Sequence, residues 1–249
     1  MGLMDGIIRV FGQREPSPEP PVHPLVTAVV AAAGSSTRMG VPKQFLPLGG
    51  MPVIARTLLA LDAAQLVDEI VLVAREEDML QLYDICKTFE IDKASSILKG
   101  GATRQQSVAR GIAAAKKGTA FFAVHDGARP LVRPETVDRV IEAAFACGAA
   151  TAAVRVKDTV KISDEKGFIT ATPDRRFLWN VQTPQVFERR LYLTALARAQ
   201  AEGEDYTDDC QLVEHTGHPV RLVEADYGNI KITTPEDVAF AEGLLGREI

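Results

Sequence analysis

The chain has 249 residues, of which 46% are hydrophobic and 24% are charged, and its formal net charge is −5. This composition is that of an ordinary globular protein, and it excludes a mostly disordered chain, a collagen-like chain and a coiled coil. Binding of nucleic acid is not expected, because it needs a basic face. No apolar run approaches the roughly 20 residues that cross a bilayer, so no membrane partner is expected either. The three cysteines form no CxxC pair and their number is odd, which argues against a disulfide framework and fits a reducing cytoplasm.

The N-terminal stretch differs from the rest of the chain because five of the 14 prolines lie between residues 16 and 24. So many prolines cannot sit in a helix, and residues 1–24 are therefore predicted to be a flexible extension. The apolar residues before the prolines, Ile7 and Ile8 among them, are expected to form at most one short amphipathic turn, with a partner-docking helix as the alternative. A single domain is predicted over residues 25–249.

Elements between residues 25 and 150 alternate between strand and helix. Apolar runs at 26–33, 69–74 and 120–125 predict buried strands, and helical periodicity is present at 52–64, 76–89, 104–117 and 134–147. This alternation predicts an α/β fold with a mostly parallel sheet and helices on both faces.

The pattern changes after residue 150, where short strands alternate with turns. Strands are predicted at 151–156, 159–162 and 168–172, and the last two enclose a turn at 164–167. The resulting β-hairpin, about 154–173, is expected to project as an arm. Because such an arm is too small to be stable alone, it is expected to pack on a second subunit. The chain is predicted to close with strands at 185–187 and 220–223 and with helices at 188–200, from near 207, and at 235–245.

The loop after the first strand is the first candidate site, because open α/β sheets bind ligands beyond the carboxyl ends of their strands. Residues 31–44 read Ala-Ala-Ala-Gly-Ser-Ser-Thr-Arg-Met-Gly-Val-Pro-Lys-Gln, which is neither a Walker A loop nor a GxGxxG fingerprint. The small residues let backbone N–H groups approach an anion, and Arg38 and Lys43 supply positive charge. The loop therefore suits a polyphosphate, and the alternative is a solvated loop with two surface charges.

A second candidate site follows the strand at 120–125. Asp126 is placed to hold Mg²⁺ opposite a phosphate-binding loop, and a turn or helix cap is the alternative. Arg129 either adds positive charge towards the substrate or pairs with Asp126. His125 is interpreted as a packed, hydrogen-bonded histidine, since no metal-binding companion lies near it in sequence.

Four residues further along the chain are weaker candidates. Arg175 and Lys231 are possible clamps for a second phosphate, and Thr159 and Thr207 are possible hydroxyl donors. Each of the four is individually more typical of an ordinary surface position than of a site.

Motifs of a known family appear in order along the chain. They are Ala-Ala-Gly-x3-Arg-Met-Gly-x-Pro-Lys-Gln, Gly-Gly-x-x-Arg-x-x-Ser-Val, His-Asp-x-Ala-Arg-Pro, Asp-Thr-Val-Lys, Thr-Pro-Gln, Thr-Asp-Asp and Asn-Ile-Lys. Over residues 25–245 the sequence resembles the 2-C-methyl-D-erythritol 4-phosphate cytidylyltransferase family of the non-mevalonate isoprenoid pathway. The resemblance implies a Rossmann-like nucleotidyltransferase fold and a homodimer joined through the arm. It also implies a reaction of CTP with methylerythritol 4-phosphate, in the presence of Mg²⁺, that yields the CDP-linked alcohol and pyrophosphate.

The resemblance also implies roles for individual residues. The candidate catalytic cations are Arg38, Lys43, Arg175 and Lys231. The residues expected around the cytidine nucleotide and its metal are Ala32, Ala33, Gly34, Gly101, Ser107 and Asp126, with Asp126 as the metal ligand. The residues expected to bind the acceptor substrate are Arg129, Thr159, Arg175, Thr207 and Lys231. In this family the arm of one subunit completes the pocket of its neighbour, so Thr159 and Arg175 are expected to act across the dimer. The sequence departs from the family pattern at Gly127 and at Ala102.

The chemistry of the reaction agrees with this set of residues. A phosphate monoester is largely ionised at pH 7, because its second pKa is about 6, so its oxygen needs no general base. The reaction needs alignment and relief of charge repulsion, and direct in-line attack on the CTP α-phosphate without a covalent enzyme intermediate is expected. Ribitol-5-phosphate cytidylyltransferase and a sugar-1-phosphate nucleotidyltransferase are alternatives within the fold. A non-catalytic nucleotide-binding module is the alternative of another class, and it would be expected to lack Arg38, Lys43 or Asp126.

Overall fold

A computed structural model of the chain describes residues 6–10, 23–34 and 42–246. Within these residues, eight strands form one sheet in the order β1-β6-β5-β2-β7-β11-β8-β12. Their bounds are Ile7–Arg9 (β1), Val26–Ala32 (β2), Glu69–Ala74 (β5), Ala94–Lys99 (β6), Phe121–Asp126 (β7), Ala149–Arg155 (β8), Trp179–Glu188 (β11) and Arg221–Glu224 (β12).

The sheet is mostly parallel, as the sequence predicts. β6, β5, β2 and β7 pair in parallel, and β12 pairs in parallel with β8. β11 is antiparallel to both β7 and β8, and β1 is antiparallel to β6. The carboxyl ends of β2, β5, β6 and β7 therefore lie along one edge of the sheet, where ligands of such sheets bind.

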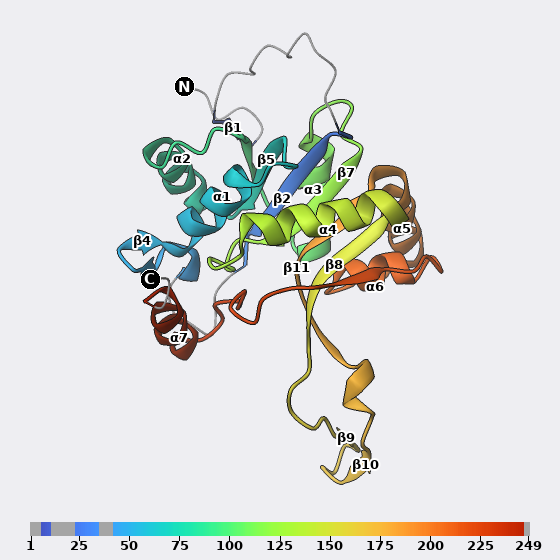
Figure 1. The fold of residues 1–249 in the computed structure, drawn as a ribbon. Helices are drawn as coiled ribbons and strands as arrows, with labels where there is room; N and C mark the ends of the chain where they lie inside the picture. The colour runs from blue at the N-terminus through green and yellow to red at the C-terminus, as the bar shows by residue number, and fades with distance from the viewer. Residues whose placement is uncertain (1–5, 11–22, 35–41, 247–249) are drawn as a thin grey trace.

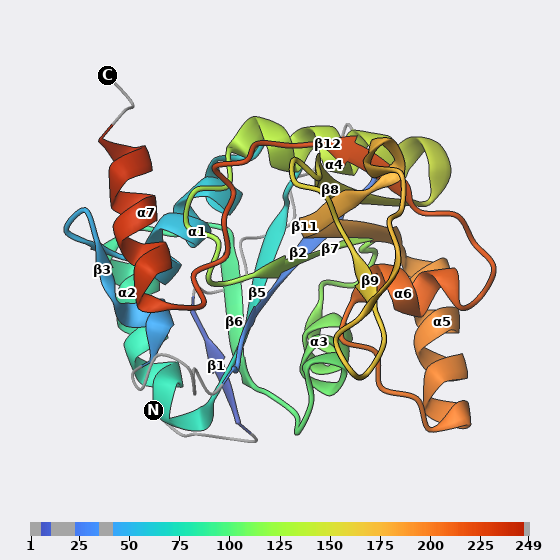
Figure 2. The same ribbon diagram turned by 90° about the horizontal axis from the view of Figure 1, so that it is seen from below.

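Helices cover both faces of the sheet (Figures 1 and 2). Their bounds are Val53–Ala63 (α1), Met79–Thr88 (α2), Arg104–Ala114 (α3), Pro134–Cys147 (α4), Arg189–Glu202 (α5), Asp209–Glu214 (α6) and Pro235–Leu245 (α7). Residues that alternate along β2 pack against different helices, as the two-residue period of a strand requires. Val30 packs in the cluster that contains residues of α1, α2 and α4, whereas Val29 packs in the cluster that contains residues of α3 and α5.

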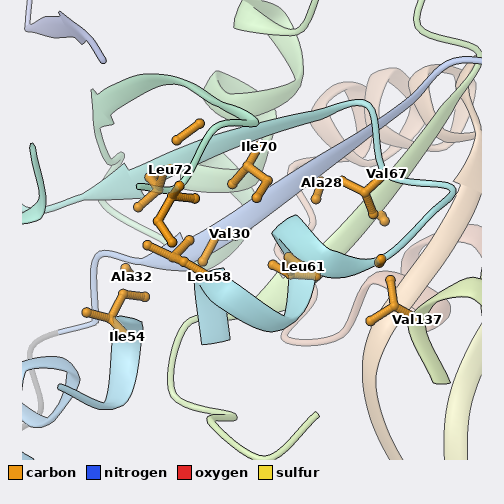
Figure 3. Close-up of a cluster of buried hydrophobic side chains, with 14 of the residues drawn as sticks. Ala28, Val30, Ala32, Ile54, Leu58, Leu61, Val67, Ile70, Leu72 and Val137 are labelled. Carbon is orange, nitrogen blue, oxygen red and sulfur yellow. The ribbon is translucent and has the colours of Figure 1, made fainter. Parts of the chain in front are cut away.

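The larger of these two clusters is shown in Figure 3, where Val30 of β2 lies beside Leu58 of α1 and Leu61 lies farther along the same helix. All three side chains are fully buried. A third cluster joins α7 to the short hairpin of β3 (Pro47–Leu48) and β4 (Met51–Pro52). Among the described residues, no helix combines the length and the apolar character needed to span a bilayer.

Local sequence signals explain the helix bounds. Pro134 occupies the start of α4, where its missing N–H costs nothing, and Gly148 ends the helix in the left-handed conformation. Thr103 caps α3 by accepting a hydrogen bond from the Gln106 N–H. α4 and α7 have the bounds predicted from the sequence, and α1, α2, α3, α5 and α6 differ from the prediction by a few residues at their ends.

Two strands of the sheet were not predicted. β6 has polar residues over half its length, which hides its strand character. The predicted amphipathic turn near Ile7 and Ile8 is wrong, because these residues form β1 and pair with Leu98 and Ile97 of β6. Pairing satisfies the backbone hydrogen bonds of the segment while Ile8 is buried. Residues 1–5 and 11–22 lie outside the described part of the chain, and the domain boundary near residue 25 stays a prediction.

A projecting hairpin arm is present, as the predicted fold class requires. The chain leaves the sheet after Arg155 and returns at Trp179, which is the register partner of Arg155. Between them lie β9 (Ile162–Ser163), β10 (Ile169–Ala171) and a 3₁₀ turn, η3 (Arg175–Phe177). The arm extends away from the sheet (Figure 1). It exposes the large apolar side chains of Ile162, Phe168, Ile169 and Phe177.

Candidate active site

A buried carboxylate surrounded by cations lies at the carboxyl end of β7. Lys231 Nζ is 2.8 Å from Asp126 Oδ2, Arg129 Nε is 3.5 Å from the same oxygen, and Arg104 Nε is 3.9 Å from Oδ1. Burial opposes ionisation of Asp126, but Lys231, Arg104 and Arg129 outweigh it and hold its pKa well below the usual range. Asp126 is therefore a fixed negative charge at neutral pH.

Lys231 reaches Asp126 because its loop is hydrogen-bonded to the turn that follows β7. The Ile232 N–H donates to the Ala128 carbonyl at 2.8 Å, and Arg129 Nη1 donates to the Asn229 carbonyl at 2.7 Å. The Asn-Ile-Lys and His-Asp-x-Ala-Arg-Pro motifs, about a hundred residues apart, thus meet at one place. Arg129 is buried and engaged within this contact, which favours the interpretation in which it pairs with Asp126.

His125 is fully buried beside Asp126 and is hydrogen-bonded, as the sequence interpretation expects. Its Nδ1 lies 3.0 Å from Thr183 Oγ1, and that oxygen also accepts a hydrogen bond from the Asp126 N–H at 3.0 Å. Burial lowers the pKa of His125 to about 3, so the ring is neutral at physiological pH. His125 and Thr183 therefore hold the end of β7 in place rather than supply a base.

Three residues that sequence reasoning missed extend the charged cluster away from Asp126. Arg104, at the start of α3, places Nη1 2.5 Å from Asp209 Oδ2, and Tyr192 donates its hydroxyl to Asp209 Oδ1 at 2.5 Å. Burial and the charge of Asp209 raise the pKa of Tyr192 well above its usual value, so it remains a donor. Burial works to lower the pKa of Arg104, but Asp209 and Asp126 raise it above the ordinary range. Arg104 thus bridges two carboxylates as a permanent cation.

The sequence did contain a signal for Arg104 and Asp209, because they belong to the Gly-Gly-x-x-Arg and Thr-Asp-Asp motifs. The Thr-Pro-Gln motif meets the same place. Gln185 Oε1 accepts hydrogen bonds from the Asp209 and Cys210 N–H groups at 3.2 Å, and Gln185 Nε2 donates to Asp208 Oδ2 at 2.7 Å. Thr207 lies directly before this contact and is exposed.

The residues assigned to the nucleotide lie at the ends of β2 and β6. The Gly101 N–H donates to Ser107 Oγ at 3.0 Å, and that hydroxyl donates to the Thr103 carbonyl at 2.8 Å. A Cβ at Gly100 would lie 2.7 Å from Ala33 Cβ, so glycine is required there for the two chain segments to approach. Gly34 is exposed beyond the end of β2 and Ala32 is buried within it.

Of the two cations of the first loop, only Lys43 belongs to the residues that the structure describes. Lys43 is half-buried at the start of η1 (Lys43–Phe45). The next residue, Gln44, donates to Asp78 Oδ2 at 2.9 Å, which fixes η1 against the segment after β5. Arg38 lies outside the described residues.

Thr159 and Arg175 are not brought to Asp126 of their own chain. Both are exposed on the arm, and Arg175 Nη1 donates to the Lys157 carbonyl at 3.0 Å. The arm carries them away from the carboxyl end of β7 (Figure 1).

The donor set around Asp126 fits Mg²⁺. No group of three or more metal-ligating side chains occurs among residues 6–10, 23–34 and 42–246. Mg²⁺ is usually bound through one or two carboxylates together with substrate phosphates and water, so a single ionised aspartate is sufficient. Lys231 and Arg129 approach Oδ2, whereas Oδ1 faces Arg104 at the longer distance of 3.9 Å. Oδ1 is therefore the oxygen suited to a metal.

Comparison with known proteins gives consistent results. The family model IspD, 2-C-methyl-D-erythritol 4-phosphate cytidylyltransferase, matches residues 26–247. A protein of that name from Caldanaerobacter subterraneus subsp. tengcongensis is 46% identical over 223 residues, which cover 88% of this chain and 98% of the relative. One from Pelotomaculum thermopropionicum is 45% identical and covers 88% of this chain and 94% of its own length.

Solved structures agree in fold. The 4-diphosphocytidyl-2C-methyl-D-erythritol synthase from Anaerococcus prevotii superposes with a TM-score of 0.81 at 34% identity, over 90% of this chain and 96% of that one. The 2-C-methyl-D-erythritol 4-phosphate cytidylyltransferase from Thermus thermophilus superposes with a TM-score of 0.72 at 35% identity, over 88% of this chain and 98% of that one.

Proposed function

The chain belongs to the 2-C-methyl-D-erythritol 4-phosphate cytidylyltransferase family and is a nucleotidyltransferase, and we propose how its own residues join CTP to methylerythritol 4-phosphate. The acceptor phosphate oxygen attacks the α-phosphorus of CTP. The bond from the α-phosphorus to the bridging oxygen of the β-phosphate breaks, and pyrophosphate leaves with the electron pair. The observation that carries the proposal is the meeting of Lys231 with Asp126, at 2.8 Å, at the carboxyl end of β7.

The main requirement of the reaction is to bring two negatively charged groups together, the acceptor phosphate and the triphosphate of CTP. Transfer of a proton is less important. The acceptor phosphate is already largely ionised at pH 7, since its second pKa is about 6. The one histidine at this place, His125, is neutral and buried against Thr183, which supports a mechanism without a general base. Fixed cations that contact the transferring phosphoryl group then supply most of the rate enhancement.

The residues divide into a nucleotide side and an acceptor side. On the nucleotide side, the backbone at Ala32, Ala33 and Gly34 and the pair Gly101 and Ser107 surround the cytidine nucleotide. Arg38 and Lys43 stabilise the charge that develops at the α-phosphate. Asp126 Oδ1 would hold Mg²⁺, which when bound neutralises charge on the triphosphate.

On the acceptor side, Lys231 lies beside Asp126 and holds the phosphate of methylerythritol 4-phosphate, with Thr207 as a nearby hydroxyl donor. Arg129 supports this side indirectly by holding the Asn229 carbonyl of the Lys231 loop.

Arg175 and Thr159 complete the acceptor side from the arm of a second copy, which makes the enzyme a homodimer. This arrangement is supported by the exposure of both residues and by the apolar side chains that the arm exposes. The free thiols of Cys86, Cys147 and Cys210 fit action in the reducing cytoplasm.

Pyrophosphate release by the purified protein with CTP and Mg²⁺ tests the proposal. Methylerythritol 4-phosphate should support release, and ribitol 5-phosphate should not. Lys231→Gln should abolish most of the release, whereas Lys117→Gln, at an exposed position beyond the end of α3, should leave it unchanged. Release with ribitol 5-phosphate alone would assign a different acceptor, and CTP binding without release would indicate a binding module.

A further inference from the structure

Strand β1 lies outside the part of the chain that matches the family, which begins at residue 26. Its three residues pair in an antiparallel register with β6, with Ile7 opposite Leu98, Ile8 opposite Ile97 and Arg9 opposite Ser96. β6 would otherwise be the outer strand of the sheet, with unpaired backbone groups along its edge. The N-terminal extension therefore adds a strand to a sheet that the rest of the chain already forms.

Burial of side chains holds this added strand in place. Ile8 and Val10 are 8% and 3% exposed and belong to the large hydrophobic cluster that contains residues of α1 and α2. The Val10 N–H also donates to the Ser95 carbonyl at 3.2 Å. Ile7 points to the opposite face and is 40% exposed, so the two faces of β1 contribute very differently to its docking.

The same strand contacts the turn that leads into the nucleotide side of the site. The Lys99 N–H donates to the Gly6 carbonyl at 3.1 Å, and the next N–H, that of Gly100, donates to the Ala74 carbonyl at 2.8 Å. Arg110 Nη1 donates to the carbonyls of Lys99 and Gly100 at 3.2 and 2.7 Å. The backbone before Gly101 is thus held from β5, from α3 and from the extension.

A cavity of about 570 Å³ lies beside this turn. Gly6, Ile7, Lys99 and Arg110 are among the residues that line it. If β1 leaves the sheet, one wall of the cavity is lost and the Lys99 N–H loses its partner. The turn then keeps its contacts with β5 and α3 but is no longer held on the side of the extension.

We propose that residues 6–10 are an accessory edge strand that fixes the turn at residues 99–101, so that docking of this strand strengthens the binding of CTP. The inference rests on the proposed function only in naming CTP as the ligand of the turn. The docking itself and the order of the turn do not depend on that assignment.

Two variants of the full chain test the proposal. Ile8→Ser/Val10→Ser removes the buried side of β1, and Arg9→Ser, at an exposed position of the same strand that does not line the cavity, is the control. Hydrogen exchange at the Lys99 amide and calorimetric titration with CTP and Mg²⁺ are measured for each. In the first variant we expect exchange to accelerate by at least about 10-fold and the Kd for CTP to rise about 10-fold. The KM for methylerythritol 4-phosphate should stay within about twofold. The control should resemble the wild type in all three.

A further variant guards against a general loss of fold. Gly6 has a φ of +69°, which a β-branched residue disfavours, so Gly6→Val should displace the carbonyl that accepts from Lys99 while Ile8 and Val10 stay intact. It should weaken CTP binding in the same direction.

Three results would overturn the inference. Unchanged exchange at Lys99 in all variants would show that β1 is not docked in solution. Faster exchange with an unchanged Kd would make β1 a cover for the sheet edge with no effect on the nucleotide. If the wild-type protein bound no CTP, both the proposed function and the effect of β1 on CTP binding would be wrong. Hydrogen exchange at the Lys99 amide would still show whether β1 is docked.

Discussion

The carboxyl end of β7 and the arm contain the same kinds of polar residue in opposite surroundings. Asp126 and Arg129 are buried, whereas Arg104 is half-buried and Lys231 is exposed, and each of the three cations lies within 3.9 Å of the Asp126 carboxylate. On the arm, Arg175 is exposed and donates to the Lys157 carbonyl, and the exposed Asp174–Arg176 pair is of the kind that contributes little to stability. The first region is assembled by folding of one chain, whereas the second leaves charged and large apolar side chains exposed.

This difference has a consequence for how function is divided. In the proposed function, the nucleotide side and the metal ligand belong to the region that folding alone assembles, whereas Thr159 and Arg175 act only after association of two chains. Changes at the end of β7 should therefore act within a subunit, and changes on the arm should act on the neighbouring subunit.

Asp126→Asn should have the largest effect. It removes the proposed metal ligand and leaves three cations facing a neutral group, so kcat should fall by at least about 10³-fold. Calorimetry should also show that Mg²⁺ no longer strengthens CTP binding. The matched change on the arm, Asp164→Asn, lies in an exposed turn and should leave kcat nearly unchanged. If the Asp126→Asn enzyme were active, Asp126 would not be the metal ligand.

Lys43→Ala should lower kcat by at least about 10²-fold, which is the effect of removing one transition-state donor. Because Lys43 lies in a short 3₁₀ turn outside the sheet, the circular dichroism spectrum should not change. Lys117→Ala serves as the control for loss of one lysine. A near-normal kcat in the purified variant would exclude Lys43 from the mechanism.

A mixture of two inactive variants tests the division between subunits most directly. Arg175→Ala removes the arm cation and Asp126→Asn removes the body carboxylate, so each homodimer should be inactive. In a dimer that contains one of each, one of the two sites has both residues intact. Equal amounts, refolded together, should recover about one quarter of the wild-type activity, because half of the dimers are mixed and each has one good site. No recovery would place Arg175 and Asp126 in the same subunit's site.

Arg104→Gln should lower kcat/KM by about 10-fold, with most of the change in the KM for the CTP–Mg²⁺ complex. The variant removes the cation that fixes Asp126 and Asp209, and it does not remove a group that contacts the reacting atoms. Arg104→Lys should restore part of the loss. Arg139→Gln, which changes an exposed arginine of α4, should leave KM unchanged, and an unchanged KM in Arg104→Gln itself would show that the bridge is dispensable.

Tyr192→Phe should have the smallest effect, a loss of about 1–2 kcal/mol in the free energy of unfolding, because Asp209 loses a buried donor. The folded-state pKa of Tyr192 is raised, so its contribution is complete below the ordinary tyrosine pKa near 10 and is lost as the pH rises above it. Urea unfolding at pH 8 and above pH 10 should therefore show that the free energy of unfolding falls less between these two pH values in the variant than in the wild type. Tyr227→Phe, an exposed tyrosine at the base of the arm, should change stability by less than about 0.5 kcal/mol. Equal losses in the two variants would contradict the special role of the buried pair.

Much of the fold could be predicted from the sequence because its signals are local. β5 is a continuous apolar run and α4 has proline at its start and glycine at its end, and both have the predicted bounds. The strand direction of β11 could not be predicted, because it depends on where the arm returns to the sheet. β1 is only three residues long, and it is a strand because it pairs with β6, which no local signal in its sequence predicts.

The candidate site was predictable to a similar extent. The motifs indicated Asp126 and Lys231, and the structure brings them together. Sequence reasoning could not find that Arg104 pairs with Asp209, because the two are 105 residues apart and only the tertiary fold brings the first residues of α3 and α6 together. Arg38 lies outside the described residues, and the roles of the arm residues stay predictions.

The register of β8 and β11 makes the arm a self-contained insertion. Arg155, where the chain leaves the sheet, lies directly opposite Trp179, where it returns. These two residues are therefore already as close as the residues that flank a tight hairpin turn. A two-residue turn can replace the whole segment between them without moving the neighbouring strands. The segment can therefore be lengthened, shortened or exchanged, in evolution or in design, without rebuilding the core of the sheet.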